Sequence, residues 1–206
     1  MVRELTEKNL IYQLRQYKVK RRVQFFPETE STNTVAKKLC NEGKGAGALI
    51  VADCQTAGRG RLGRTFCSPK GTGIYVTPVY ELHGNEKNMD LISPLAGLAV
   101  RDTLYNMFGL ETTVKWPNDV LYEGKKLCGI LCEIVNVNNR PKYVVVGVGL
   151  NVQSGAFPDD VACVAGVISE FYQGEIDRNE LCVELVHNMD RYIQRTNALT
   201  EDNKEV

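Results

Sequence analysis

A segment rich in glycine and arginine follows a short apolar stretch in the first third of the chain. The apolar residues 48–53 predict a buried strand, and the letters GRGRLG stand soon after it at residues 58–63. They match the GxGxxG pattern of dinucleotide-binding folds, in which a helix begins inside the loop. Here Pro69 and two glycines follow, and these residues prevent a helix from starting. The segment therefore predicts an extended loop over residues 55–73 and excludes a Rossmann fold.

Hydrophobic periodicity and helix-end signals predict the other elements. Predicted helices cover residues 4–17, residues 31–43, residues 89–108 and a stretch that opens with a capping box of Asp177 and Glu180. The third helix is expected to bury a stripe of Leu91, Leu95, Leu98 and Tyr105. Predicted strands cover residues 21–26, 48–53, 74–80, 112–116, 127–135 and 142–148. Turns near 123–124 and 138–139 are short enough for antiparallel neighbours.

Strands with helices packed mainly on one face give an α+β fold built on a mixed β-sheet. We interpret residues 1–206 as a single domain. Its core is expected at residues 25–151, a mainly helical part at 157–197 and a polar tail at 198–206.

The charge balance limits the partners that the chain could bind. Lysine plus arginine and aspartate plus glutamate each number 25, so no global basic field attracts nucleic acid or an anionic membrane. The N-terminal residues lack a secretory signal, and no apolar run reaches the roughly 20 residues of a membrane helix. We therefore expect a soluble, cytoplasmic protein that binds neither nucleic acid nor membrane.

Cysteine and histidine give no sign of a disulfide framework or a metal site. The seven cysteines include no CxxC pair, and Cys128 and Cys132 fall on one predicted strand, about 13 Å apart. We expect free thiols. The two histidines, His83 and His187, are too few for a multi-histidine metal site and are interpreted as surface or packing residues.

Four clusters of polar and glycine residues are candidates for a site, and each also has a structural interpretation. The glycine loop carries Arg59, Arg61 and Arg64, whose guanidinium groups bind phosphate or carboxylate oxygens in pairs. Alternatively it is a solvated basic loop or a patch for RNA. The second cluster, KWPND at residues 115–119, combines a cation, the only tryptophan, an amide and a carboxylate. Alternatively Trp116 is a core residue and the rest is a turn.

The other two clusters lie at strand ends. Lys125 and Lys126 precede an apolar strand, where a lysine can enter a pocket beside Gly129. Alternatively they are turn lysines that face water. The sequence GVGLN at residues 147–151 puts two glycines and an amide at the end of the most apolar strand, either for strand packing or for a ligand.

The order and spacing of these clusters resemble the catalytic domain of biotin protein ligases. The residues that carry the resemblance are GRGRLGR at 58–64, KWPND at 115–119, KKLCGIL at 125–131 and GVGLN at 147–151. The sequence STN at 31–33 and Gln55 are also similar to early ligand-binding residues of that family. The resemblance covers about residues 25–151 and implies a class II synthetase-like biotin/lipoate ligase catalytic domain.

The resemblance implies an ATP-dependent biotin protein ligase. In that family the biotin carboxylate attacks the α-phosphorus of magnesium-ATP, which gives biotinyl-5′-AMP and pyrophosphate, and a carrier lysine then takes the biotin. ATP, Mg²⁺ and biotin are thus implied as co-substrate, ion and substrate, without a tightly bound cofactor. The implied partner is a biotin carboxyl carrier protein or domain of a carboxylase such as acetyl-CoA carboxylase.

Individual roles follow from position in the family's motifs. Lys126 and Arg61 are the implied catalytic residues, because positive charge is needed where two anions meet. The implied biotin-binding residues are Ser31, Thr32, Asn33, Gln55, Gly58, Arg59, Arg61, Lys126, Gly129 and Gly147. The implied ATP-binding residues are Arg61, Arg64, Phe66, Lys115, Asn118, Lys126 and Asn151. Asp119 either orients a cation or helps to hold magnesium.

Some features depart from the family, and other functions stay open. Phe66 stands where a tryptophan usually covers adenine, Leu62 replaces a basic residue, and the segment after Asn151 predicts helices instead of a small β-domain. A lipoate or octanoate ligase or transferase of the same fold is one alternative, and a non-catalytic biotin or adenylate sensor is another. A DNA-binding repressor is not expected, because the roughly 24 residues before the first core strand are too few for a winged helix-turn-helix. The sequence does not decide whether the chain forms a homodimer.

Overall fold

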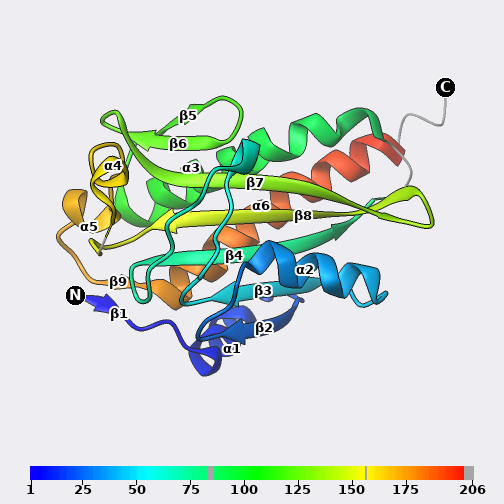
Figure 1. Cartoon of the computed structure of the whole chain (residues 1–206). Helices are drawn as coiled ribbons and strands as arrows, with labels where there is room; N and C mark the ends of the chain where they lie inside the picture. The colour runs from blue at the N-terminus through cyan, green and yellow to red at the C-terminus, as the bar shows by residue number, and fades with distance from the viewer. Residues whose placement is uncertain (83–85, 156, 202–206) are drawn as a thin grey trace.

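The computed structural model describes residues 1–82, 86–155 and 157–201, which fold around a mixed β-sheet (Figure 1). In this described part, seven strands form the sheet in the order β2-β3-β4-β8-β7-β6-β5. They are β2 (Arg22–Phe26), β3 (Ala48–Ala52), β4 (Gly73–Glu81), β5 (Thr113–Lys115), β6 (Asp119–Tyr122), β7 (Lys125–Val137) and β8 (Arg140–Asn151). Strands β2 and β3 are parallel, and the other neighbouring pairs are antiparallel. The predicted mixed sheet is confirmed.

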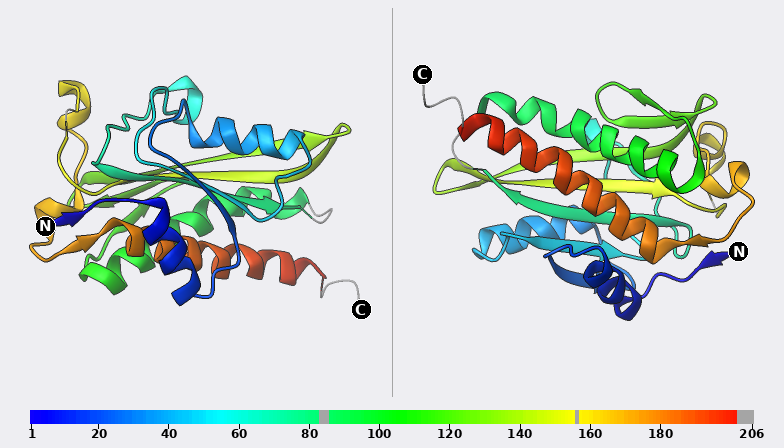
Figure 2. Two further views of the ribbon diagram at one scale, coloured as in Figure 1. Left: turned by 90° about the horizontal axis from the view of Figure 1, so that it is seen from below. Right: turned by 180° about the vertical axis from the view of Figure 1, so that it is seen from behind.

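The helices frame this sheet. They are α1 (Glu7–Gln16), α2 (Thr32–Asn41), α3 (Ile92–Phe108), α4 (Asp159–Ala162), α5 (Ile168–Phe171) and α6 (Arg178–Glu201). Short 3-10 helices span Arg61–Gly63 and Glu86–Leu91, and a two-stranded parallel pair joins β1 (Val2–Arg3) to β9 (Ile176–Asp177). Helices α1, α3 and α6 lie on one face of the sheet and α2 on the other (Figure 2). The helices are therefore mainly on one face, as predicted.

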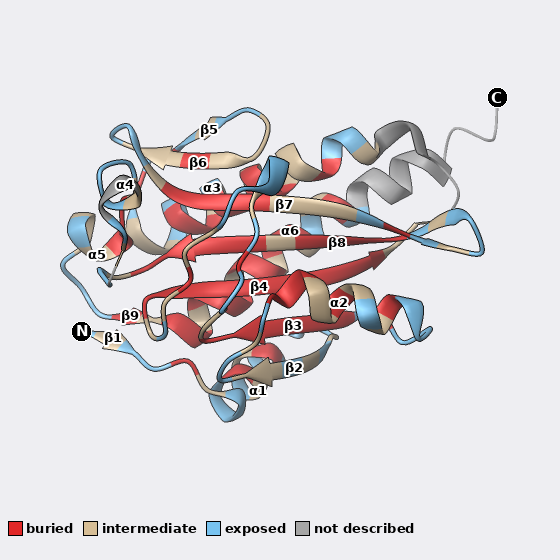
Figure 3. Cartoon of the chain, viewed as in Figure 1, coloured by how far each residue is buried: buried red, intermediate tan, exposed pale blue. Residues whose placement is uncertain are grey.

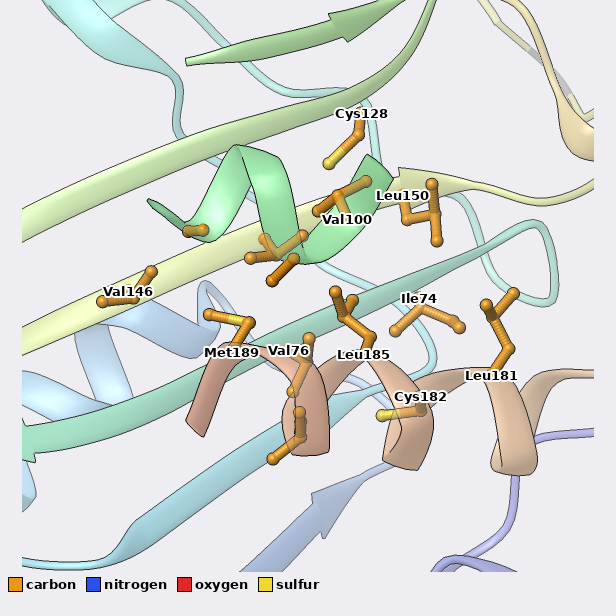
Figure 4. Packing of buried hydrophobic residues seen from close by; sticks show 14 of the residues in the cluster. Ile74, Val76, Val100, Cys128, Val146, Leu150, Leu181, Cys182, Leu185 and Met189 are labelled. Carbon is orange, nitrogen blue, oxygen red and sulfur yellow. The ribbon is translucent and has the colours of Figure 1, made fainter. Parts of the chain in front are cut away.

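Apolar burial is deepest in the central strands, which Figure 3 shows as buried along most of their length. Side chains of β4 such as Ile74 and Val76 meet Leu185 and Met189 of α6 and Val100 of α3 (Figure 4). A second, smaller cluster fills the space under α2 and consists of Ala36, Cys40, Ala48, Ile50, Val79, Val135, Tyr143 and Val145. Burial on both faces explains why β3 and β4 are continuous apolar runs.

The stripe predicted for α3 is wrong. Leu91 precedes the helix and is 46% exposed, and Tyr105 is 55% exposed. The buried face instead consists of Ile92, Ala96, Gly97, Ala99, Val100, Thr103 and Leu104. Small residues occupy this face because α3 packs closely: a Cβ at Gly97 would lie 3.1 Å from Cγ1 of Val114. Two stripes fit the period of the helix, and the predicted one is half-buried at Leu95 and Leu98 and exposed at its two ends.

Strand β6 was not predicted, because its four residues directly follow the turn of the KWPND sequence. The predicted turn at 123–124 joins β6 to β7, and the predicted turn at 138–139 joins β7 to β8.

At the start of α6, Oδ1 of Asp177 accepts the backbone N–H groups of Asn179 at 2.8 Å and Glu180 at 3.3 Å. This N-cap was predicted. The carboxylate of Glu180 accepts the hydroxyl of Tyr17 at 3.2 Å.

The remaining predictions concern the cysteines, the histidines, the C-terminal tail and membrane-spanning helices. All seven cysteines are free of disulfides, and Cys128 and Cys132 lie on the same strand as predicted. His187 packs edge-on against Tyr17, whereas His83 lies outside the described residues. Helix α6 continues through residue 201, past the predicted start of the tail, and residues 202–206 lie outside the described part. Among the described residues, no helix combines the length and apolarity that a membrane crossing requires.

A buried ion pair fixes the start of α6 to the sheet. Arg178 is 2% exposed, and its guanidinium contacts Oδ1 of Asp53, which directly follows β3, at 2.5 Å. The same guanidinium donates to the carbonyl oxygen of Gly73 at 2.6 Å. Because Asp53 and Gly73 flank the two ends of the glycine loop, this pair holds both ends at one point.

We expect Arg178→Met to lower the free energy of unfolding by about 3–5 kcal/mol, because the Asp53 carboxylate would stay buried without its cation. Urea denaturation measures this change. The control is Lys125→Met, since Lys125 pairs with Glu170 at the exposed surface, and it should leave the unfolding free energy almost unchanged. The Asp53→Asn/Arg178→Met double variant removes both charges and should be more stable than Arg178→Met. A double variant that is no more stable would contradict this explanation.

Candidate active site

A cavity of about 260 Å³ lies between the glycine loop and the middle of the sheet. The loop connects β3 to β4 and extends across β8 and β7 on the face that carries α2 (Figures 1 and 2). The residues around the cavity are Ser31, Thr32, Gln55, Arg59, Gly60, Arg61, Leu62, Arg64, Thr65, Phe66, Asn118, Asp119, Lys126, Gly129, Ile130, Leu131, Gly147, Val148 and Gly149. All four sequence clusters therefore contribute to one site.

Residues 58–66 form a small hairpin, which we call the glycine hairpin. The backbone N–H of Phe66 donates to the carbonyl of Gly58 at 2.9 Å, and that of Gly60 donates to the carbonyl of Arg64 at 2.7 Å. Between these bonds, Arg59 and Thr65 form an antiparallel bridge. The 3-10 turn Arg61–Gly63 is the tip. The predicted glycine and arginine loop thus has backbone pairing of its own.

The floor beneath the hairpin is a pair of glycines on adjacent strands. Gly129 of β7 faces Gly149 of β8 in the sheet register, and the ring of Phe66 rests on both. A Cβ would lie 2.3 Å from Cε1 of Phe66 at Gly149 and 2.9 Å from Cε2 at Gly129. Any side chain at Gly149 would therefore displace the ring, so these glycines make room for an aromatic residue of the protein itself.

One wall of the cavity carries the cations. Nζ of Lys126 lies 2.8 Å from Oδ1 of Asp119, and the same oxygen accepts Nδ2 of Asn118 at 2.9 Å. Oδ1 of Asn118 in turn accepts the guanidinium of Arg61 at 3.1 Å. Because β6 pairs with the start of β7, the KWPND turn brings its amide and carboxylate next to Lys126. The two predicted catalytic cations are thus joined through Asn118 and Asp119.

The opposite wall is neutral and polar. Oε1 of Gln55 accepts the backbone N–H of Thr32 at 2.9 Å and the Thr32 hydroxyl at 3.1 Å. Nε2 of Gln55 donates to Oγ of Ser68 at 2.8 Å. Ser31 is the N-cap residue of α2, and its side chain makes no capping hydrogen bond. These groups are fixed by the start of α2 and the end of β3, so they form a rigid set of donors and acceptors.

Four predicted site residues lie outside the cavity wall. Asn33 is buried and packs on Gly147, where a Cβ would lie 2.2 Å from its Oδ1. Gly58 is the first residue of the hairpin and is buried, and a Cβ there would lie 2.4 Å from the carbonyl oxygen of Phe66. Asn151 donates to the backbone carbonyl of Lys126 at 3.3 Å. Lys115 is an exposed residue of β5. The first three support the wall, whereas Lys115 does not reach it.

Two other outcomes concern the KWPND cluster. Trp116 is 69% exposed, so the alternative that places it in the core is wrong. Asp119 is the acidic residue of the described cavity wall, and its Oδ1 is occupied by Lys126 and Asn118. Within residues 1–82, 86–155 and 157–201, no group of three or more histidine, cysteine, aspartate or glutamate side chains could hold a metal ion.

Two residues of the site were missed by sequence reasoning. Glu133 of β7 accepts Asn33 at 2.9 Å, Lys37 at 2.8 Å and Arg59 at 3.2 Å. Thr77 of β4 is fully buried, and its Oγ1 lies 2.7 Å from Oδ1 of Asn33. A carboxylate or a hydroxyl inside an otherwise apolar strand is the signal that could have identified both.

The charge of Glu133 is stabilised by these donors. Burial by itself would raise the pKa of the Glu133 carboxyl, but hydrogen bonds from Lys37 and Asn33 and the charges of Lys37 and Arg59 outweigh it. The net result is a pKa below the usual 4.5. Since the folded pKa is depressed, this carboxylate stabilises the fold above its unfolded pKa, and the contribution disappears as the pH falls through the folded value.

We expect the difference in unfolding free energy between the wild type and Glu133→Gln to be largest near about pH 6 and to shrink toward about pH 3. The variant lacks a titrating group at this position, so the acid-dependent part of the difference belongs to Glu133. Urea denaturation at both pH values measures it. A difference that stays constant between them would contradict the depressed pKa.

The sequence matches the Biotin/lipoate A/B protein ligase family over residues 25–151. It is 38% identical to the bifunctional ligase/repressor BirA of Bacillus spizizenii, over 72% of this chain and 46% of that protein. It is 35% identical to the biotin–[acetyl-CoA-carboxylase] ligase of Mycobacterium tuberculosis, over 86% of this chain and 66% of that protein. The chain thus spans about half the length of the first of these relatives.

Solved structures agree with the sequence match. The biotin protein ligase of Aquifex aeolicus in complex with biotin and ATP has a TM-score of 0.73 at 29% identity, over 85% of this chain and 71% of that one. The biotin protein ligase of Leishmania major in complex with biotinyl-5-AMP has a TM-score of 0.69 at 26% identity, over 88% and 80% of the two chains. The family match covers more than half of the sequence, with the same boundaries that the motifs indicated, so the chain belongs to the biotin/lipoate A/B protein ligase family.

Proposed function

We propose that the chain is an ATP-dependent biotin protein ligase that makes biotinyl-5′-AMP and transfers biotin to a lysine of a carrier domain. The observation that carries this proposal is the two-walled cavity. Its neutral polar wall contains Thr32 and Gln55, and its cationic wall contains Lys126 and Arg61. One wall suits a neutral ring with donors and an acceptor, and the other suits the anions that must react.

The first step requires a carboxylate to approach a phosphate. An oxygen of the biotin carboxylate forms a bond to the α-phosphorus, and the bond from that phosphorus to the pyrophosphate oxygen breaks. Negative charge accumulates on the phosphoryl oxygens as this happens, so fixed positive charge lowers the barrier. Lys126 is held at this wall by Asp119 before any substrate is present. We assign Lys126 to the carboxylate and α-phosphate, and Arg61 to the same phosphate from the hairpin side.

The second step consumes the mixed anhydride. The amine of the carrier lysine attacks the acyl carbon, AMP leaves with the electrons of the acyl–oxygen bond, and the amine loses a proton. The anhydride must be kept from water until the carrier arrives. The glycine hairpin covers the cavity, and Arg61 at its tip can hold the phosphate with two parallel hydrogen bonds. We therefore assign retention of the adenylate to Arg61.

The polar wall favours biotin over a lipoyl or octanoyl substrate. The biotin ureido ring offers two N–H donors and a carbonyl acceptor, and Gln55 and Thr32 present matching groups. A dithiolane or an alkyl chain lacks these donors and this acceptor, so it would form fewer hydrogen bonds with the wall. The Mycobacterium tuberculosis relative and both solved structures described above are named as biotin ligases, which supports the same choice. The acceptor that we propose is the carrier domain of a biotin-dependent carboxylase.

Incubation with ATP, biotin and a biotin carboxyl carrier domain, followed by mass measurement of the carrier, tests the proposal. We expect one biotinyl group per carrier, with none on a carrier whose acceptor lysine is replaced by arginine. Lipoic acid in place of biotin should give much less product. A carrier that stays unmodified while adenylate forms would favour a sensor, and efficient use of lipoic acid would favour a lipoate ligase.

Lys126→Ala should slow adenylate formation by about 100-fold, which corresponds to about 3 kcal/mol of lost transition-state stabilisation. Pyrophosphate release under single-turnover conditions measures this rate. Lys125→Ala is the control, because the adjacent lysine contacts Glu170 on the surface, and its rate should match the wild type. Unchanged pyrophosphate release in Lys126→Ala would remove Lys126 from the catalytic assignment.

Arg61→Gly should make the protein release its adenylate early, because the change removes the phosphate contact and loosens the hairpin tip together. Free adenylate acylates lysines indiscriminately, so biotin should appear on a bystander such as albumin. The amount of biotin on the bystander is compared between the variant and the wild type after both have produced the same amount of adenylate. Arg61→Lys keeps the charge without the planar fork and should give intermediate labelling. Bystander labelling at the wild-type level would transfer the retaining role to Arg59 or Arg64.

A further inference from the structure

Glu133 lies outside the cavity wall, yet three donors from two segments converge on its carboxylate. Oε1 accepts Nζ of Lys37 at 2.8 Å. Oε2 accepts Nδ2 of Asn33 at 2.9 Å and the guanidinium of Arg59 at 3.2 Å. Lys37 and Asn33 belong to α2, whereas Arg59 belongs to the glycine hairpin. One side chain of the sheet therefore connects the helix of the polar wall to the glycine hairpin.

The contact with Arg59 fixes more than one side chain. Arg59 forms the backbone bridge with Thr65, and the hydrogen bonds of Phe66 to Gly58 and of Gly60 to Arg64 flank that bridge. The two strands of the hairpin therefore move together. Since Glu133 contacts Arg59, it is one of the groups that hold the hairpin against the sheet.

The contact with Asn33 leads to the polar wall. Nδ2 of Asn33 donates both to Glu133 and to the carbonyl of Leu131, at 3.1 Å. This orients the amide so that its Oδ1 faces Oγ1 of Thr77, 2.7 Å away. Oγ1 of Thr77 lies 2.9 Å from the hydroxyl of Thr32, and the absence of a side chain at Gly147 makes room for the Asn33 amide. Asn33 and Thr77 thus connect Glu133 to the hydroxyl of Thr32.

The hydrogen bonds then return to the hairpin. Thr32 donates to Gln55, Gln55 donates to Oγ of Ser68 at 2.8 Å, and Ser68 donates to the carbonyl of Phe66 at 3.1 Å. Phe66 is the last residue of the hairpin and Arg59 is near its first. A closed ring of contacts therefore links both strands of the hairpin with the residues that we assign to the ureido ring.

From this ring we propose that Glu133 is a positioning residue that couples closure of the glycine hairpin to the polar wall of the biotin site. It acts through Arg59 on one side and through Asn33 on the other. The part of the proposal that concerns biotin rests on the proposed function. The part that concerns the hairpin does not, because it can be measured without any substrate.

Hydrogen exchange of residues 58–66 in the ligand-free protein tests the hairpin part. Arg59 is 42% exposed, and a pair of this kind contributes modestly, so Glu133→Gln should speed exchange about two- to fivefold. Arg59→Gln should give the same increase, and the double variant should show no further increase, because both changes remove one contact. Lys37→Gln is the matched control. It removes another ion pair of the same carboxylate without touching the hairpin, so exchange of residues 58–66 should stay at the wild-type rate.

Steady-state kinetics of adenylate formation tests the coupling. A hairpin that is closed less often reduces the fraction of competent protein that biotin meets. Glu133→Gln should therefore raise KM for biotin about two- to fivefold, with kcat within about twofold of the wild type. Glu133→Ala also removes the acceptor of Asn33 and should raise KM further. Lys37→Gln loses a comparable ion pair and should leave KM for biotin unchanged. If general loss of stability caused the rise in KM, Lys37→Gln would raise KM as much as Glu133→Gln does.

The outcomes separate the two proposals. Exchange in Glu133→Gln at the wild-type rate, or faster exchange in the double variant than in either single variant, overturns the role of Glu133 at the hairpin. Faster exchange with an unchanged KM for biotin overturns the coupling. A wild-type protein that makes no adenylate from biotin and ATP overturns the proposed function instead, and the exchange result stands by itself.

Discussion

The site has to hold positive charge in place while it is empty, because the proposed reaction brings a carboxylate and a triphosphate together. Cations placed side by side repel one another and lose hydration, so each needs a local acceptor. Lys126 has Asp119 at 2.8 Å, Arg61 has Asn118 at 3.1 Å and Arg59 has Glu133 at 3.2 Å. These acceptors orient the cations before substrate arrives, which is the condition for electrostatic catalysis at low reorganisation cost.

The register of the sheet determines the positions of these hydrogen-bond acceptors. Gly129 faces Gly149 across β7 and β8, and without side chains at this point the hairpin can lie directly on the strands through Phe66. Asp119 pairs with Gly129 from the other side, so the same row of the sheet carries the carboxylate of the cationic wall. A shift of one residue would turn these side chains to the opposite face. The buried strand pairing thus sets the geometry of the groups to which we assign catalysis.

Local sequence patterns predicted much of this arrangement. Most strands of the large sheet, α2 and the cap at Asp177 follow from apolar runs and capping residues, which act within a few positions, whereas the short β6 did not follow. The buried face of α3 did not follow, because two stripes fit its period and only packing distinguishes them. The roles of Glu133 and Thr77 did not follow either, since their partners are far apart in sequence: Asn33 and Glu133 are separated by 100 positions. Motif order identified which polar residues meet, and only the fold shows which of them face the cavity.

The contacts that hold the hairpin are weak enough to be exchanged for substrate. Arg59 is 42% exposed, Glu133 24% and Lys126 34%, and pairs of this kind contribute about 0.2–1 kcal/mol each. Opening the hairpin therefore costs far less than unfolding the sheet beneath it, whose central strands are buried on both faces. By contrast, the base of the loop is tied by the buried pair of Arg178 and Asp53. The base of the loop is therefore fixed, whereas its tip is held only by weak contacts. In the proposed reaction the tip can open for substrate and then close again in the same position.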